Sequence, residues 1–179
     1  MKYLFLLSFL LNLFQVRSFS FHGATAPLGV FDPFKFQEKT DLSALARFRE
    51  SELKHGRWAM IAASSIPLIE TKTHSPAIHE FDKLPANLQL GIVGFILMGE
   101  GASMLKGWKN PFENGTSNYF KLEDDYQPGD LGFEISNHDD VDFHNKELNN
   151  GRLAMIAVAG MVAQELVTNK PLLFSNTLW

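Results

Sequence analysis

The chain has 179 residues and a formal net charge of −4. This length suffices for one domain with a sizeable core, and the mild acidity argues against nucleic-acid binding, which usually needs a basic face. The sequence contains no cysteine, which excludes disulfides, thiolate metal sites and cysteine nucleophiles. No phosphate-binding loop or nucleophile–base set stands out either, so an enzyme is not expected.

The first 26 residues are expected to be a targeting segment. An apolar run, Leu4 to Phe14, follows Lys2 and precedes Arg17. The run is too short to span a membrane, so it predicts a secretory signal peptide that is later removed; a retained membrane anchor is the alternative. The acid-free stretch that follows, up to residue 26, is typical of a short transit peptide. Residues 27–179 then form the working domain.

Three helices are expected in that domain, over Ser43–Lys72, Pro85–Lys106 and Asp142–Thr168. Each is long enough to cross a bilayer, which takes about 20 residues. Charged residues in the first half of the first helix lower its hydropathy, and Pro67 is expected to kink or end its last turn. The predicted fold class is an all-α membrane protein with three transmembrane helices.

An internal repeat relates the first and third helices. Residues 52–62, Glu-Leu-Lys-His-Gly-Arg-Trp-Ala-Met-Ile-Ala, return at 147–157 as Glu-Leu-Asn-Asn-Gly-Arg-Leu-Ala-Met-Ile-Ala. The offset is 147 − 52 = 95 positions, and Glu70 and Glu165 keep it. Two unrelated apolar helices would share Leu, Ala and Ile, but not Glu, Gly and Arg at fixed spacing. The repeat predicts a crossed pair of helices related by a pseudo-two-fold axis.

The repeat also suggests how its charges are paired. Glutamate and arginine in a membrane segment are costly unless paired or ligated. Within the first helix, Glu52 and Arg57 lie about 140° apart around the axis, which is poor geometry for an ion pair. Two-fold symmetry offers a better arrangement, in which Glu52 pairs with Arg152 and Glu147 pairs with Arg57.

The residues around these charges favour a membrane protein over the alternative, a soluble helical bundle with surface salt bridges. The glycines beside the arginines, Gly56 and Gly151, allow two backbones or a flat ligand to come close. The segments 58–69 and 153–163 are apolar or small on all sides, whereas a soluble helix would show a polar stripe there.

Several side chains in the repeat suit a metal that is already held by a macrocycle. A glutamate that gives one oxygen to arginine keeps the other for a metal. His55 follows Glu52 by three residues, and Asn150 follows Glu147 by three. Gln164 lies about 40° from the face of Asn150 and roughly 21 Å along the helix. Such separate donors suit one axial bond each to magnesium, as in chlorophyll. A lone histidine or glutamine on a helix is more often structural, but the repeat favours ligands at its first turn.

With these motifs, the chain resembles the light-harvesting chlorophyll-binding family, and most closely its fucoxanthin–chlorophyll a/c branch. The Glu-x-x-His-x-Arg and Glu-x-x-Asn-x-Arg motifs look like the signature of that family's crossed helices. Gln164 stands where the family places another chlorophyll ligand. The segments 27–34 and 127–133 are similar to the loops that hold carotenoid ends, although Phe133-Glu134-Ile135-Ser136 departs from the family's usual continuation.

The resemblance implies a set of site residues. The axial ligands to chlorophyll magnesium are Glu52, His55, Glu147, Asn150 and Gln164. Their ion-pair partners are Arg57 and Arg152. The second helix matches the family less well; Gln89 and Glu100 lie about 20° apart around its axis and are candidates to bind pigment. For Gln89 an interfacial polar role near the helix start is an equal alternative.

The resemblance also implies the function. The protein would bind chlorophyll a, chlorophyll c and a fucoxanthin-like xanthophyll, and pass excitation energy to a photosystem core. It would lie in the plastid thylakoid membrane after loss of residues 1–26, among lipids and other antenna subunits, in an oligomer. A photoprotective member of the same family is the alternative, and a small membrane transport protein is a more distant one.

Overall fold

The computed structural model describes residues 32, 33, 35, 41–113, 119–130, 132 and 141–173. The predicted targeting segment at 1–26 lies outside these residues. So do most of segment 27–34 and residues 131 and 133 of segment 127–133, the two segments expected to hold carotenoid ends, together with the departure at 133–136.

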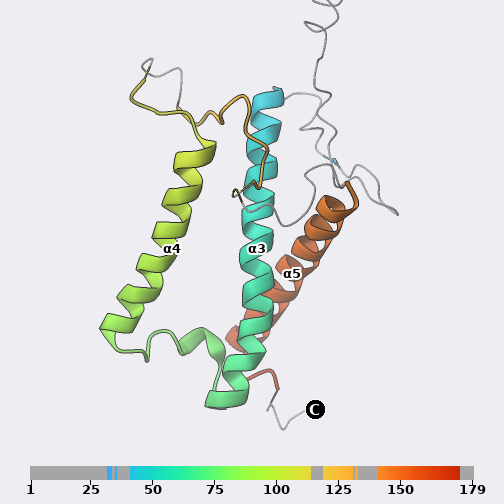
Figure 1. The fold of residues 1–179 in the computed structure, drawn as a ribbon. Coiled ribbons are helices and arrows are strands. Elements are labelled where there is room, and N and C mark those ends of the chain that lie inside the picture. The colour runs from blue at the N-terminus through green and yellow to red at the C-terminus, as the bar shows by residue number, and fades with distance from the viewer. Residues whose placement is uncertain are drawn as a thin grey trace, which may run out of the picture.

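Three long helices make up the described fold, in agreement with the predicted fold class as all-α. They are α3 (Leu42–Thr73), α4 (Ala86–Gly107) and α5 (Val141–Thr168), and a short 3-10 turn, η1 (Ala77–His79), follows α3. The sequence places the same three helices to within one residue at each end. In Figure 1, α3 stands centrally, α5 crosses it, and α4 stands to one side.

Two of the described helices, α4 and α5, are long and apolar enough to cross a membrane. The charged residues in the first half of α3 make that helix too polar to be identified as a membrane span by its hydropathy, as the sequence indicates. Little of the protein covers α4, since Leu90 is 73% and Leu105 90% exposed. Apolar side chains this open to the surroundings suit lipid or bound ligand better than water.

Helix α3 passes through Pro67, so of the two effects expected of this proline, a kink or an early end, the early end is excluded. The helix continues to Thr73. Its last turn carries Glu70, whose buried carboxylate holds other parts of the chain in place. That anchorage fixes the end of the helix although the proline lacks a backbone donor.

The crossing of α3 and α5 is a backbone-to-backbone contact at two glycines. A Cβ added to Gly56 would lie 3.1 Å from the Cα of Gly151, and one added to Gly151 would lie 3.0 Å from the Cα of Gly56. The buried apolar residues Leu53, Leu148 and Ala154 surround this point. The expectation of close approach at the paired glycines is confirmed.

The repeat extends past the segment recognised in the sequence, through the ends of both helices. His74 and Asn169, which are 169 − 74 = 95 positions apart, both adopt a left-handed backbone with φ of 53° and 50°. Each closes its helix in the same way: His74 N donates to Glu70 O at 2.9 Å, and Asn169 N donates to Glu165 O at 2.8 Å. These are left-handed C-caps without glycine.

The side chains of the same two glutamates hold the helix ends together. Each is fully buried. Glu70 accepts from Leu172 N at 2.8 Å and from Leu173 N at 3.2 Å, in the chain that leaves α5. Glu165 Oε2 accepts from Ile78 N at 3.0 Å, in the chain that leaves α3. The carboxylate near the end of each helix therefore binds the segment that follows the other helix. These bonds supply the hydrogen-bond donors that a buried carboxylate needs.

The two glutamates differ in whether their second carboxylate oxygen has a hydrogen-bond partner, and this difference yields a prediction. Glu165 Oε1 is buried without a partner among the described residues, whereas both oxygens of Glu70 accept. Glu70→Gln turns an acceptor into a donor that faces a backbone N–H, so we expect it to destabilise the protein by about 1–3 kcal/mol. Glu165→Gln can place its amide nitrogen at the partnerless position and should cost much less. Thermal unfolding of both variants tests this; equal losses would contradict it.

The glycine crossing yields a second prediction. Gly56→Ala forces a methyl group against the backbone of α5, so the free energy of unfolding should fall by about 1–3 kcal/mol. Gly94→Ala in α4 is the matched control, because a Cβ there meets nothing within 4 Å. The control should keep or raise stability, since alanine favours helix more than glycine does. A Gly56→Ala variant as stable as the control would show that the crossing is loose.

Candidate functional site

Two reciprocal ion pairs connect the halves of the repeat. Arg57 Nε donates to Glu147 Oε1 at 2.7 Å, and Arg152 Nε donates to Glu52 Oε1 at 2.7 Å. These are the pairs that the repeat predicts, and the prediction is confirmed. The contacts lie beside the crossing glycines, so each helix supplies the charge that neutralises the other.

The second oxygen of each glutamate differs between the pairs. Glu52 Oε2 accepts from Arg49 Nη1 at 2.7 Å, whereas Glu147 Oε2 accepts no hydrogen bond from the described residues. The expectation of a free oxygen therefore holds for Glu147. For Glu52, a metal would use the remaining lone pair of an oxygen that already accepts a bond. Arg49 is a contact that the repeat does not reveal, although its i, i+3 spacing to Glu52 is an ordinary helical signal.

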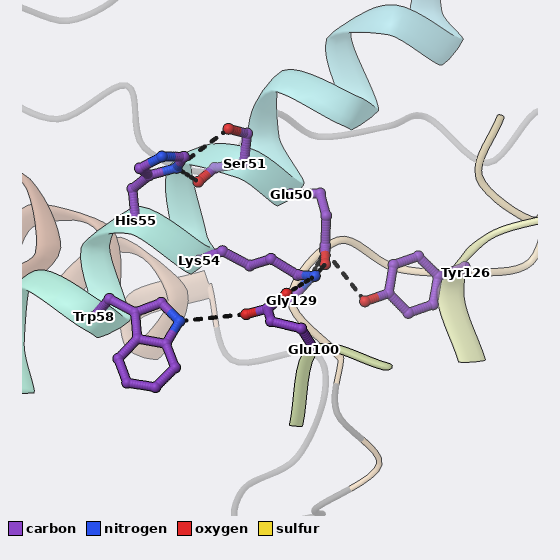
Figure 2. Close-up of polar contacts among 8 residues, drawn as sticks. All are labelled: Glu50, Ser51, Lys54, His55, Trp58, Glu100, Tyr126 and Gly129. Atoms are coloured by element: carbon purple, nitrogen blue, oxygen red, sulfur yellow. Dashed lines mark hydrogen bonds and ion pairs between the residues drawn. The ribbon is translucent and has the colours of Figure 1, made fainter. Parts of the chain in front are cut away.

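The ring of His55 is oriented for single-point ligation. Its Nδ1 lies 2.7 Å from Ser51 O and 3.3 Å from Ser51 Oγ (Figure 2). A carbonyl oxygen only accepts, so Nδ1 carries the proton and the lone pair is on Nε2. The side chain is exposed, which leaves Nε2 open on the outer face of α3. A ring nitrogen held by a backbone carbonyl on one side and open on the other is the usual state of a histidine ligand.

Asn150 and Gln164 extend the set of open donors along α5. Both residues are exposed, and neither side chain hydrogen-bonds to another described residue. The structure therefore leaves both amides available, at well-separated levels of one helix. Within the described part of the chain, no group of three His, Asp or Glu side chains converges on one point.

Gln89 has a structural role at the start of α4. Its Nε2 donates to Phe81 O at 3.0 Å and to Leu84 O at 3.1 Å, which closes the turn that leads into the helix. This contact matches the alternative of an interfacial polar residue. The amide oxygen makes no such contact, so its predicted role toward pigment stays a prediction.

Glu100 lies where α4 meets α3. Its Oε2 accepts from Lys54 Nζ at 2.8 Å and its Oε1 accepts from Trp58 Nε1 at 3.3 Å (Figure 2). Sequence reasoning singled out Glu100 but gave it no partner, because the pairing joins two helices that share no repeat.

Glu50 makes contacts near the candidate site that sequence reasoning missed. It is 2% exposed, and its Oε2 accepts from Tyr126 OH at 3.2 Å and from Gly129 N at 2.7 Å. These bonds fix the 119–130 segment against α3 (Figure 2). Burial raises the pKa of the Tyr126 hydroxyl above its ordinary value, and the Glu50 carboxylate adds to the rise, so the tyrosine stays a neutral donor.

The chemistry of these donor atoms suits axial ligation of a metal that is already bound in a flat macrocycle. The available atoms are an imidazole nitrogen and amide oxygens on exposed helix faces, and ion-paired carboxylates that are partly buried beside the crossing. Magnesium accepts all three donor types, and a metal already bound by four macrocycle nitrogens needs only one more. A free ion would instead need several convergent ligands.

Comparison with known proteins agrees with this chemistry. The family model described as chlorophyll A-B binding protein matches residues 20–166. The chain is 39% identical over 164 residues to the chloroplastic light-harvesting complex stress-related protein 3.2 of Chlamydomonas reinhardtii, covering 81% of this chain and 62% of that protein. It is 38% identical over 161 residues to a chloroplastic fucoxanthin-chlorophyll a-c binding protein of Isochrysis galbana, covering 82% of this chain and 76% of that protein. The chain thus spans less than two thirds of the stress-related relative's length.

The unequal surroundings of the two ion pairs yield a prediction. Arg57→Leu removes the arginine on which Glu147 depends and should destabilise the protein by about 1–3 kcal/mol. Arg152→Leu leaves Glu52 with Arg49, so its loss should be clearly smaller. Thermal unfolding of the two variants, each with its native ligands present, measures the difference. If Arg152→Leu proved equally harmful, Arg49 would not compensate for the lost partner.

Proposed function

Because the chain belongs to the chlorophyll A-B binding protein family, we propose that it harvests light: it binds chlorophylls and carotenoids and passes excitation energy to a photosystem core. The family is non-enzymatic, so the protein's part is to hold pigments in place. Its relatives are chloroplastic, and its apolar helices suit integration into the thylakoid membrane.

The observation that carries this proposal is the state of His55. The bond from Nδ1 to Ser51 O fixes both the tautomer and the ring, and Nε2 points to an exposed face with its lone pair available. A histidine that merely fills a core would have both nitrogens engaged. This one is prepared for a single ligand on the outside of the protein.

The full ligand set follows the same logic. The proposed axial ligands to chlorophyll magnesium are Glu52, His55, Glu147, Asn150 and Gln164. On α4, Glu100 and the oxygen of Gln89 are proposed to contact pigment. The bound chlorophyll would absorb light and carry the excitation. The residues set the distance of the chlorophyll from the helix and the electric field around it. Arg57 and Arg152 keep the paired glutamates in place.

The open surface of α4 supports the same conclusion. Phe95 is 70% and Leu97 65% exposed, and both lie in the middle of an apolar helix. We propose that pigment and thylakoid lipid cover these faces, and that the protein associates with other antenna subunits in an oligomer. Chlorophyll a, chlorophyll c and a fucoxanthin-like xanthophyll are the proposed pigments, in line with the fucoxanthin-chlorophyll a-c relative.

The topology in the membrane is part of the proposal. We propose that α3 crosses the bilayer together with α4 and α5, and that a pseudo-two-fold axis relates α3 to α5. The pairing of Arg49, Lys54 and Arg57 with glutamates supports a membrane location for α3, because paired charges cost far less in the bilayer than isolated ones. Residues 1–26 are proposed to direct import into the plastid and then to be removed.

A second candidate function is photoprotection, in which the same scaffold dissipates excitation as heat. The similarity to the stress-related protein of Chlamydomonas reinhardtii favours it. Harvesting and dissipation use the same pigment-binding helices, so the lifetime of chlorophyll emission, rather than its presence, separates the two.

The proposal is tested on protein reconstituted with chlorophylls and carotenoids. Carotenoid excitation should produce chlorophyll emission, and His55→Leu should lower the bound chlorophyll by one per protein. His55→Asn, which copies the second half of the repeat, should retain it. His79→Leu is the control, since it removes an exposed histidine outside the ligand set. A wild-type chain that folds without pigment would refute the proposal, and emission of very short lifetime would favour the photoprotective function.

A further inference from the structure

Polar side chains bridge α4 to α3. Lys54 Nζ lies 2.8 Å from Glu100 Oε2, and Trp58 Nε1 donates to the other oxygen of the same carboxylate (Figure 2). Around Glu100 α4 is open, since a Cβ added at Gly91, Gly94, Gly99 or Gly101 meets nothing within 4 Å. At its C-terminal end α4 instead packs against the 119–130 segment, where Gly107 faces the Tyr126 ring and Lys106 Nζ lies 2.9 Å from Asp130 Oδ2. The bridge at Glu100 is a direct polar contact between α4 and α3, on a stretch of α4 with little protein around it.

Lys54 also faces a second carboxylate. Its Nζ lies 3.7 Å from Glu50 Oε1, one helical turn earlier on α3. Glu50 is buried and already fixed by Tyr126 OH and Gly129 N. The lysine thus sits between an immobile carboxylate on its own helix and the carboxylate of α4, which limits where its ammonium group can go.

The internal repeat shows that these residues are a departure from symmetry. Positions 50, 54 and 58 are Glu, Lys and Trp, and the positions 95 further on, 145, 149 and 153, are Asn, Asn and Leu. Residues shared by both halves, such as the paired glutamates and arginines, serve the crossing of α3 with α5. A single third helix can lie against only one half. Helix α4 lies against α3, and the bridging residues are present on α3 and absent from α5.

We propose that Lys54 is a positioning residue that, with Trp58, docks α4 on α3 and holds the Glu100 carboxylate in place for a chlorophyll bound at α4. The docking part depends on the contacts alone, whereas the chlorophyll part rests on the proposed function. In this arrangement Lys54 does for Glu100 what Arg57 does for Glu147: a cation on one helix neutralises a glutamate on another. Outside water such a pair is screened little, so it is far stronger than a surface ion pair.

The docking is tested by a distance measured across the two helices. The chain has no cysteine, so Phe48→Cys on α3 and Leu105→Cys on α4 can be spin-labelled specifically; both positions are exposed, at 58% and 90%. Pulsed electron–electron double resonance on pigment-reconstituted protein then gives the distribution of distances between the spin labels at positions 48 and 105. Lys54→Met and Glu100→Met should each broaden it, and Lys54→Arg should restore it. Lys72→Met, an exposed lysine at the end of α3, is the control for loss of one positive charge.

A double-mutant cycle and the chlorophyll content separate the outcomes. Because Lys54 acts through Glu100, which also accepts from Trp58 Nε1, Lys54→Met combined with Glu100→Met should broaden the distribution no further than Glu100→Met alone. Lys54→Met should also lose up to one chlorophyll per protein, and Lys54→Arg should regain it. An unchanged distribution in Lys54→Met, or additive broadening in the double variant, would overturn the proposal. A narrow wild-type distribution without any bound chlorophyll would refute the proposed function while leaving the docking role intact.

Discussion

The architecture depends on the neutralisation of charge across a glycine crossing. Arg57 and Glu147, and Glu52 and Arg152, meet at 2.7 Å only because two backbones touch at Gly56 and Gly151. A side chain at either glycine would separate the helices and the ion pairs together. The ion pairs in turn make the crossing tolerable in an apolar medium, where a lone glutamate or arginine would be costly. Close approach and charge pairing are thus one constraint.

The same rule of reciprocal satisfaction governs the C-terminal ends of the two helices. Glu70 and Glu165 are buried carboxylates whose donors are backbone N–H groups from the chain that leaves the opposite helix. Side-chain cations neutralise the carboxylates at the crossing, and backbone donors do so at the C-terminal ends. In both places a group on one half of the repeat is satisfied by the other half. The α3–α5 pair is therefore held at its crossing and at its C-terminal ends by contacts that neither helix makes alone.

What the sequence predicts well is what the repeat or the helical period encodes. The three helices follow from apolar length, and the ion pairs follow from applying two-fold symmetry to Glu52 and its copy. The contacts of Glu50, Lys54 and Glu100 were not predicted, because they join α3 to segments with no counterpart in the repeat. The sequence left open whether Pro67 kinks or ends α3, since a proline indicates a lost backbone bond but not the buried carboxylate beyond it that anchors the turn.

In the proposed antenna, the residues that hold the two helices are the same in both halves of the repeat, whereas the residues that would ligate pigment differ. The repeat keeps its glutamates, arginines and crossing glycines, so the two halves hold the same geometry. It does not keep the outer donors: His55 corresponds to Asn150, and Gln164 corresponds to Ile69. Chlorophylls bound at equivalent places would then have an imidazole on one side and an amide on the other, or a ligand on one side only. Because an axial ligand and its field help to set the energy of a pigment, equivalent sites would differ in energy. If both halves bind pigment as proposed, a repeated frame with different ligands would give the pigments different energies without any change in their spacing.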